Sequence, residues 1–356
     1  MQSRSTSQLK KPLRLIGGVL AALALGWAGP SGAAAGCTTP QSSLGVTRIV
    51  EIDASGGPIF GKITRFAGEP RFLAPKEVVL TFDDGPVPRI TRSILKTLAT
   101  FCTKATFFPV GRMAIAYPEV VRETIKAGHS IGAHTWSHPY NMRRLKKSAA
   151  ETQLEKGFAA IAMAAGVPIA PFFRFPGLND DKRILTYLQE RGVATFTVDV
   201  VSDDSYTSDP KALVKQTIAR TIALNGGILL FHDIKMSTAL ALPEILSKLK
   251  TLGFKVVHLK SKHEFTPLGT FEAELGERLT KATDGKPLAN IALKDTVHPV
   301  GSFAIVRPPV TQLAPAAKII ELAAVREQRV KALRGTGQEK GWATTIDQRK
   351  RKDKPE

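Results

Sequence analysis

Short apolar runs alternate with amphipathic segments from residue 77 to about residue 260, and this pattern constrains the fold more than any other feature of the chain. The first apolar run, residues 77–82, is followed by residues 89–101, whose Ile90, Ile94 and Leu98 fall on one face of a helix. Regular alternation of strands and helices predicts a parallel sheet with helices outside it. We therefore predict an α/β fold, either an open sheet or a distorted (β/α) barrel, with the functional site at the carboxyl ends of the strands.

The alternation also divides the chain into regions. Further strands are predicted at residues 105–110, 130–133, 172–175, 194–200, 227–231 and 254–259, and further helices at 118–127, 149–165, 181–190, 211–224 and 241–252. Residues 36–76, which contain many glycines and prolines, are predicted to be a lead-in with a short hairpin or extended chain, and residues 77–265 to be the main domain. Residues 266–356 are predicted to be a proline-containing basic tail, largely disordered, with one candidate helix at 316–333.

The first 35 residues resemble an export signal. Arg4, Lys10, Lys11 and Arg14 are followed by an apolar stretch, residues 15–27, that is short for a membrane span, and by small residues at 33–35 that suit cleavage. An uncleaved anchor is one alternative, and a lipoprotein acylated at Cys37 is another. We expect an exported protein, periplasmic, extracellular or associated with the cell envelope, with no stable membrane span after signal removal.

Cys37 and Cys102 are the only two cysteines. In an oxidising compartment they could form a disulfide that ties the mature N-terminus to the end of the first helix. The alternative is one free or lipidated cysteine and one buried thiol.

The formal net charge of the chain is +19. The basic excess is spread along the sequence and not confined to one arm. This distribution favours a general attraction to anionic envelope polymers over a dedicated nucleic-acid site, so no nucleic-acid partner is expected.

Two adjacent carboxylates, Asp83 and Asp84, stand where the first predicted strand ends. Adjacent residues of a strand point to opposite faces, but the following Gly85-Pro86 can bend the backbone and bring both carboxylates to one cleft. Two such charges repel each other unless a cation lies nearby, so the pair is a candidate metal ligand and general base. The alternative is an ordinary strand-to-turn corner.

Histidines follow another predicted strand end. His134 and His138 come directly after residues 130–133, and two imidazoles four residues apart can share a metal ion if the backbone between them makes a helical turn. Zinc binds histidine together with carboxylate, so these residues complement the aspartate pair. Two unrelated surface histidines are the alternative.

Arg174 closes the apolar strand 172–175, where an unpaired charge would be costly to bury. A bidentate hold on one carboxylate of the site would explain it, and a structural salt bridge is the alternative.

Two further strand ends carry titratable groups. Asp199, Asp203 and Asp204 lie at or just after the end of strand 194–200, and His232 closes strand 227–231. A histidine at this place can donate a proton near neutral pH if a carboxylate holds its other nitrogen. The sequence leaves open which of the three aspartates does so, and turn-capping aspartates and a core histidine are the alternatives. Five polar groups that each end a separate strand are expected to converge on one rim.

In this order the five segments resemble the motifs of the polysaccharide deacetylase family, the NodB-type domain of carbohydrate esterase family 4. The segments are 81–86, 134–138, 174–176, the region around Asp199, and 230–232, and the resemblance covers residues 77–260. It implies a distorted (β/α) barrel of about seven strands. It also implies a metal-dependent hydrolase that removes acetyl groups from an N-acetylated polysaccharide, such as chitin-like oligomers or peptidoglycan.

Carried over by position, the resemblance assigns Asp84, His134 and His138 to one divalent metal ion, with zinc expected and cobalt or another divalent ion as alternatives. Asp83 would be the catalytic base, Arg174 its orienting partner and His232 the acid. Which of Asp199, Asp203 and Asp204 supports His232 stays open, with Asp199 named as the candidate. The expected partner is an acetylated polysaccharide. An O-acetyl esterase of xylan or another glycan, and a non-catalytic glycan-binding protein, are the alternatives.

The chain departs from the family pattern at two positions. Gly177 follows Pro176 where a tyrosine is common, and Ser205 follows Asp204 where a tryptophan is usual. Both changes alter the expected contacts with substrate more than the metal group or the base.

Overall fold

The computed structural model describes residues 43–283, and the side chains of residues 43–276. The predicted signal segment, Cys37, the candidate helix at 316–333 and the rest of the tail beyond residue 283 lie outside the described residues. The signal peptide and the Cys37–Cys102 disulfide therefore stay predictions. No described helix has the length and apolar character that crossing a membrane requires.

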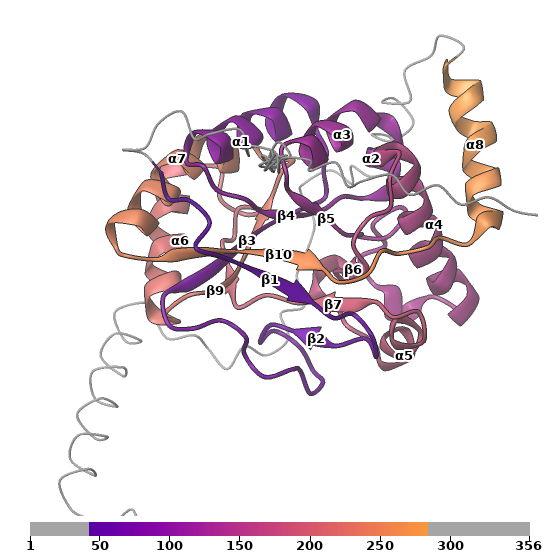
Figure 1. Cartoon of the computed structure of the whole chain (residues 1–356), viewed down its shortest axis with the longest axis horizontal. Helices are drawn as coiled ribbons and strands as arrows, with labels where there is room; N and C mark the ends of the chain where they lie inside the picture. The colour runs from indigo at the N-terminus through magenta and orange to yellow at the C-terminus, as the bar shows by residue number, and fades with distance from the viewer. Residues whose placement is uncertain (1–42, 284–356) are drawn as a thin grey trace, which may run out of the picture. The chain divides into compact units, whose positions relative to one another are not determined.

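The strands, shown in Figure 1, are β1 (Arg48–Ile52), β2 (Ile59–Phe60), β3 (Glu77–Asp83), β4 (Thr106–Phe108), β5 (Ser130–Ile131), β6 (Phe172–Phe173), β7 (Ala194–Phe196), β8 (Val200–Val201), β9 (Gly227–His232) and β10 (Lys255–Ser261). The helices are α1 (Pro88–Thr100), α2 (Gly111–Ala116), α3 (Pro118–Lys126), α4 (Lys147–Ala165), α5 (Lys182–Glu190), α6 (Pro210–Ala223), α7 (Met236–Thr251) and α8 (Gly269–Thr283), with short 3-10 turns at Met142–Arg144 and Pro176–Leu178.

All the described strand pairs are parallel, which confirms the predicted α/β fold. One sheet runs β1-β10-β3-β4-β5, with β9 pairing β3 and β8 pairing β9, and a second sheet runs β2-β7-β6. A bridge between Ala133 and Phe173 joins the end of β5 to β6. Within residues 43–283 these pairs do not form a continuous closed ring, and helices lie around the outside of the strands (Figure 1).

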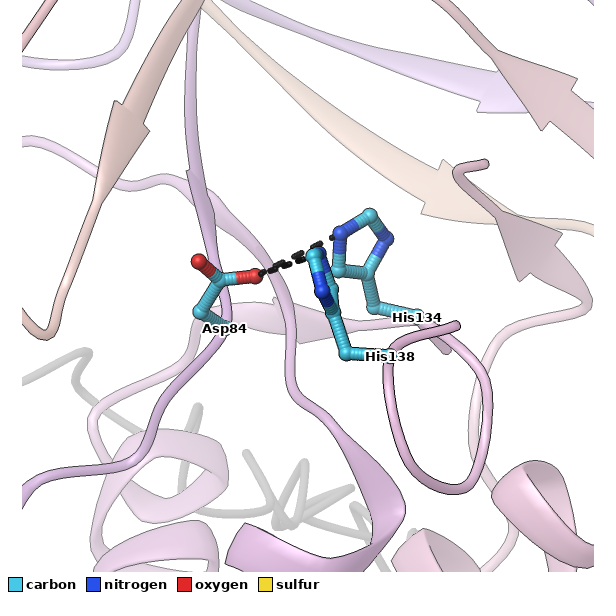
Figure 2. A group of neighbouring side chains, drawn as sticks. All are labelled: Asp84, His134 and His138. Carbon is cyan, nitrogen blue, oxygen red and sulfur yellow. Dashed lines mark ion pairs between the residues drawn. The ribbon is translucent and has the colours of Figure 1, made fainter. Parts of the chain in front are cut away.

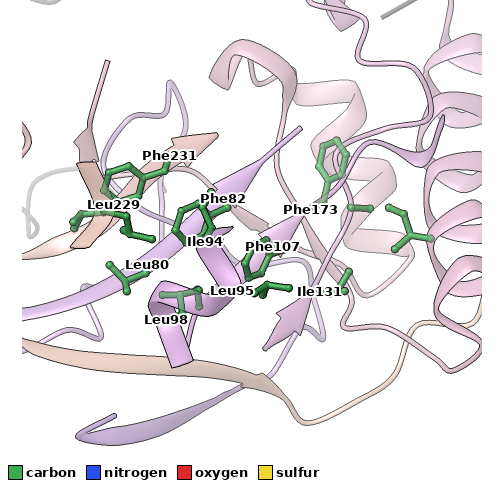
Figure 3. Packing of buried hydrophobic residues seen from close by; sticks show 14 of the residues in the cluster. Leu80, Phe82, Ile94, Leu95, Leu98, Phe107, Ile131, Phe173, Leu229 and Phe231 are labelled. Carbon is green, nitrogen blue, oxygen red and sulfur yellow. The ribbon is translucent and has the colours of Figure 1, made fainter. Parts of the chain in front are cut away.

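Strand β3 is at the centre, and all of its residues are buried. Its alternate residues Leu80 and Phe82 pack with Ile94 and Leu98 of α1 in one apolar cluster, as Figure 3 shows. Because side chains alternate across a strand, Thr81 and Asp83 point to the opposite face. This alternation separates the helix-facing side of β3 from a second side, where Val79 lies in another apolar cluster and Thr81 and Asp83 lead to the functional site.

Of the two forms predicted for the lead-in, the structure shows extended chain and not a hairpin. Strand β1 pairs with β10 and β2 pairs with β7, both in parallel, so the lead-in adds an edge strand to each sheet. The Arg48 guanidinium helps to hold this segment, because Nε and Nη2 donate to the two carboxylate oxygens of Glu77 at 2.8 and 2.6 Å.

Other elements also differ from the sequence-based expectation. The predicted strand 194–200 is two short strands, β7 and β8. Helix α2 was not predicted, and α8 lies where the tail was predicted to begin. Phe271 and Leu275 of α8 pack against Trp136, and Lys156 of α4 forms an ion pair with Glu274 at 2.6 Å.

Candidate active site

The carboxylates of Asp83 and Asp84 reach the same site because the backbone turns sharply between them. Asp83 is the last residue of β3, and Asp84 has a φ of +79°, in the left-handed region that residues other than glycine rarely adopt. This φ interrupts the strand alternation that would send the two side chains to opposite faces. Asp83 is 2% exposed, and the Gly85–Pro86 bond that follows is cis.

Asp84 faces the two histidines of the second motif, as Figure 2 shows. Its Oδ1 lies 3.4 Å from Nε2 of His134 and 3.3 Å from Nε2 of His138. The segment between the histidines is not a helical turn, because Thr135 and His138 have φ values of +69° and +56°. The His138 N–H donates to Thr135 Oγ1 at 3.0 Å, which closes this loop and turns the second imidazole toward the first.

The hydrogen bonding of His134 indicates that this group is built for a cation. Nδ1 of His134 lies 2.7 Å from the carbonyl oxygen of Arg174 and must donate to it. Burial lowers the pKa of this imidazole to about 4, so it is neutral, and its Nε2 presents a lone pair to Asp84. Asp84 Oδ1 is buried and has no hydrogen-bond partner among the described residues. An acceptor oxygen facing an acceptor nitrogen fits a metal ion, and one carboxylate with two imidazoles is a donor set that zinc accepts.

The ionisation of Asp84 agrees with this interpretation. Burial favours its neutral form, but His138 and His232 outweigh burial and hold the pKa of Asp84 below its ordinary value. The three side chains are also the one group in residues 43–276 whose ligand atoms all lie within 4.8 Å of one another.

Arg174 contacts the other aspartate. Its Nη1 donates to Asp83 Oδ1 at 2.7 Å and to Thr81 Oγ1 at 2.8 Å. The predicted bidentate hold is wrong, because Nε and Nη2 donate to the carbonyl oxygens of Phe196 and Thr197 instead. The guanidinium is fully buried. These two carbonyls, at and just after the end of β7, accept the hydrogen bonds that a second carboxylate oxygen would otherwise accept.

The structure identifies the carboxylate that holds His232 as Asp204. Asp204 Oδ1 lies 2.7 Å from Nδ1 of His232, and Oδ2 accepts from the His232 backbone N–H and from Thr238 Oγ1. Burial opposes a charged imidazole, but Asp204 outweighs it and raises the pKa of His232 to about 10. His232 is therefore protonated at neutral pH. Its Nε2 is directed toward the metal group, by which we mean the side chains of Asp84, His134 and His138, and lies 3.9 Å from Asp84 Oδ2.

The assignment of Asp199 to this supporting position is accordingly corrected. Its Oδ2 accepts from the backbone N–H of Ile228 at 2.8 Å, which ties the residue before β8 to β9. Asp203 forms an ion pair with Arg220 at 2.6 Å. Asp203 has a φ of +61°, and this turn directs Asp203 outward while the next residue, Asp204, is buried.

Aromatic residues stand beside both departures from the family pattern. Gly177 has a φ of +61°, and a Cβ there would lie 2.7 Å from the ring of Tyr140. Tyr140, two residues after His138, therefore occupies the space that a side chain at position 177 would take, and it is 37% exposed. Tyr206, which directly follows Ser205, is 61% exposed. Sequence reasoning missed these tyrosines, although their position beside the two motifs is visible in the sequence.

Comparison with known proteins identifies the family that this chain resembles. A family model described as polysaccharide deacetylase matches residues 73–196. A peptidoglycan-N-acetylglucosamine deacetylase of Bacillus cereus is 31% identical over 201 residues, which cover 54% of this chain and 71% of the relative. A chitooligosaccharide deacetylase of Azorhizobium caulinodans is 30% identical over 44% of this chain and 73% of its own length.

Other similar proteins are longer or are known as structures. A peptidoglycan-N-acetylglucosamine deacetylase of Listeria monocytogenes is 30% identical over 53% of this chain, but the match spans only 39% of the relative's length. Among solved structures, a peptidoglycan deacetylase of Bdellovibrio bacteriovorus superposes with a TM-score of 0.56 and 30% identity, covering 63% of this chain and 61% of that one. This chain belongs to the polysaccharide deacetylase family.

Proposed function

We propose that this chain is an exported, metal-dependent hydrolase that removes the acetyl group from N-acetylglucosamine units of a polysaccharide. The observation that carries the proposal is the convergence of Asp84, His134 and His138 beside a second carboxylate, Asp83, and a protonated histidine, His232. The names of the similar proteins, which act on peptidoglycan and chitooligosaccharides, support this class of substrate.

Each residue of the site has a separate role in the proposed reaction. A divalent cation held by Asp84, His134 and His138 would polarise the acetyl carbonyl and lower the pKa of a water molecule. Asp83, oriented by Arg174 Nη1, accepts a proton from the water that attacks the carbonyl carbon.

His232 acts on the leaving group. Its Nδ1–H is held by Asp204, so the proton on Nε2 is the one that faces the site. Transfer of this proton to the amide nitrogen lets the amine leave as a neutral group, and acetate is the second product.

The arrangement argues against a protein that only binds glycans. A binding protein has no need for a buried Arg174–Asp83 pair beside three metal-ligand side chains, because each buried charge costs free energy unless it is paired. The pKa of Asp84 is lowered and that of His232 is raised, and each shift favours the charged form of its group. Such shifts are typical of a catalytic site.

Acetate release tests the proposal. Wild-type protein supplied with zinc or cobalt would be incubated with chitooligosaccharides, peptidoglycan and acetylated xylan, and acetate would be measured. We expect release from an N-acetylated polymer, and a loss of about 100-fold to 10,000-fold in the Asp83→Asn variant. Asp203→Asn is the matched control, because that carboxylate pairs with Arg220 away from the metal group.

The result that would contradict the proposal is equal background release by wild type and Asp83→Asn on every polymer. Release from acetylated xylan alone would favour the O-acetyl esterase instead.

A further inference from the structure

The mechanism proposed above does not use Asp233, a carboxylate that is 2% exposed and directly follows His232. A buried carboxylate is costly unless hydrogen bonds compensate for the lost water, so its partners indicate what it does. Its partners are the turn that carries Asp83 and Asp84, and helix α1.

Asp233 holds both peptide groups that flank the Cα atom of Asp84. Its backbone N–H donates to the carbonyl oxygen of Asp83 at 3.2 Å, and its Oδ1 accepts from the N–H of Gly85 at 2.9 Å. The planes of these two peptide groups define φ and ψ of Asp84. A third hydrogen bond, from the Asp84 N–H to the carbonyl of Phe108 at 3.2 Å, fixes the first plane from its other side.

This hold matters because the conformation of Asp84 is strained. A φ of +79° is unfavourable for a residue with a Cβ, and it persists only where the surroundings impose it. If the hydrogen bond to Gly85 were lost, Asp84 could relax toward an ordinary strand conformation. Its carboxylate would then turn away from His134 and His138.

Asp233 is itself fixed from α1. Thr91 Oγ1 lies 2.7 Å from Asp233 Oδ2 and 3.2 Å from the Asp233 carbonyl oxygen, and it accepts from the N–H of Val87 at 2.9 Å. Space also limits the contact, since a Cβ at Gly85 would overlap the Asp233 carboxylate. Only glycine lets the carboxylate reach the peptide N–H.

We propose that Asp233 is a positioning residue that imposes the left-handed turn at Asp84 and thereby sets the geometry of the metal group. This inference rests on the proposed function for its catalytic consequence. Its structural content, the link between Asp233 and metal affinity, can be tested without any substrate.

The experiment measures zinc affinity by competition with a chromogenic chelator, together with thermal unfolding in the absence of metal. We expect Asp233→Ala to weaken zinc binding by at least tenfold. Asp233→Asn should bind zinc within about threefold of wild type, because an amide oxygen can still accept from Gly85 and the amide N–H can donate to Thr91, whose own hydroxyl proton then turns to the Asp233 carbonyl.

Asp180→Ala is the matched control. Asp180 is also 2% exposed, and it likewise accepts from one threonine hydroxyl, Thr64, and one backbone N–H, that of Arg65. A merely structural role for Asp233 predicts that both alanine variants lose stability and that neither loses zinc affinity. Should Asp233→Ala not fold, Thr91→Val replaces it, with an expected loss of about threefold in zinc affinity.

The inference is overturned if Asp233→Ala binds zinc as tightly as Asp180→Ala does, if Thr91→Val in its place matches wild type, or if wild type binds no divalent metal. If zinc affinity falls as expected but wild type releases no acetate from any polymer, the inference stands and the proposed function fails.

Discussion

Two pairs of buried or partly buried histidines lie at opposite ends of strand β5. His129 precedes the strand and is near His258 of β10, whereas His134 follows the strand and faces His138. Burial lowers the pKa of His129 to about 3, and those of His258 and His134 to about 4. By burial and pKa alone, the two ends of β5 would look alike.

The charges and hydrogen bonds beside each pair differ. At the first end, the positive charges of Lys104 and Lys260 lower the pKa values of both histidines further, and His129 Nδ1 accepts from the N–H of Ala105 at 3.1 Å. At the second end, His134 faces Asp83 and Asp84, and its lone pair meets an acceptor oxygen. A buried neutral histidine therefore indicates a metal site only when carboxylates accompany it and its free nitrogen has no donor.

The largest expected effect comes from mutating one histidine at each end of β5. His134→Ala should weaken zinc binding by more than about 100-fold, because mutating even a residue that only hydrogen-bonds to a metal ligand typically costs about 10-fold to 100-fold. It should also abolish acetate release. His129→Ala should keep zinc binding, and it should destabilise the fold by about 1–3 kcal/mol because the Ala105 N–H is left buried without a partner. Zinc titration and urea unfolding of both variants check this crossed pattern. A His129→Ala protein that is stable but no longer binds zinc would break the comparison.

The next effect concerns the acid. Asp204 raises the pKa of His232, so Asp204→Asn should lower that pKa, and the protonated acid should be lost at a lower pH. We expect kcat to fall by about 100-fold and the alkaline limb of its pH profile to move to lower pH. Asp199→Asn is the control, because Asp199 contacts Ile228 and not His232. An alkaline limb that stays in place in Asp204→Asn, or that moves in Asp199→Asn, would contradict this assignment.

Much of the site could be predicted from the sequence because strand ends are visible there. Asp83, His134, Arg174 and His232 each follow or close an apolar run, and a parallel sheet brings the carboxyl ends of its strands together. The register of β3 and β9 then places Asp83 directly opposite His232.

What the sequence left open depends on backbone conformation in loops. The choice among Asp199, Asp203 and Asp204 is decided by a left-handed turn at Asp203 that no residue type announces. The role of Asp233 also required the fold, because its partner Gly85 lies 148 residues away in the chain. Helix α8 was missed for a related reason, since Phe271 and Leu275 form an apolar face only in contact with α4.

A smaller effect is expected for stability against pH. His129 and His258 are neutral in the folded protein, whereas in the unfolded chain each binds a proton below a pKa near 6.5. The unfolded state therefore gains protons as pH falls, and stability drops between pH 6.5 and about 4 by up to about 1.4 kcal/mol per pH unit for each histidine.

Urea unfolding at pH 7 and pH 5, with a chelator present, measures this slope. His258→Gln should reduce the pH dependence by about 2 kcal/mol over that interval relative to wild type, because glutamine does not titrate. Equal slopes for the two proteins would mean that His258 is not held neutral by the fold.

The smallest effect tests which end of β5 receives the polymer. His138 is 30% exposed and Tyr140 is 37% exposed, whereas His129 and His258 are both buried, so His138 and Tyr140 are open to a ligand and the two other histidines are not. Because the Tyr140 ring covers Gly177 beside the Arg174 segment, we expect it to contact a sugar ring bound next to the reacting one. Tyr140→Ala should raise KM about threefold to tenfold with kcat nearly unchanged, the pattern for an interaction made equally in the ground and transition states.

Tyr140→Phe keeps the ring and should resemble wild type. A fall in kcat at constant KM would instead connect Tyr140 to the metal loop, since it follows His138 by only two residues, and steady-state kinetics on chitooligosaccharides of increasing length separates these outcomes.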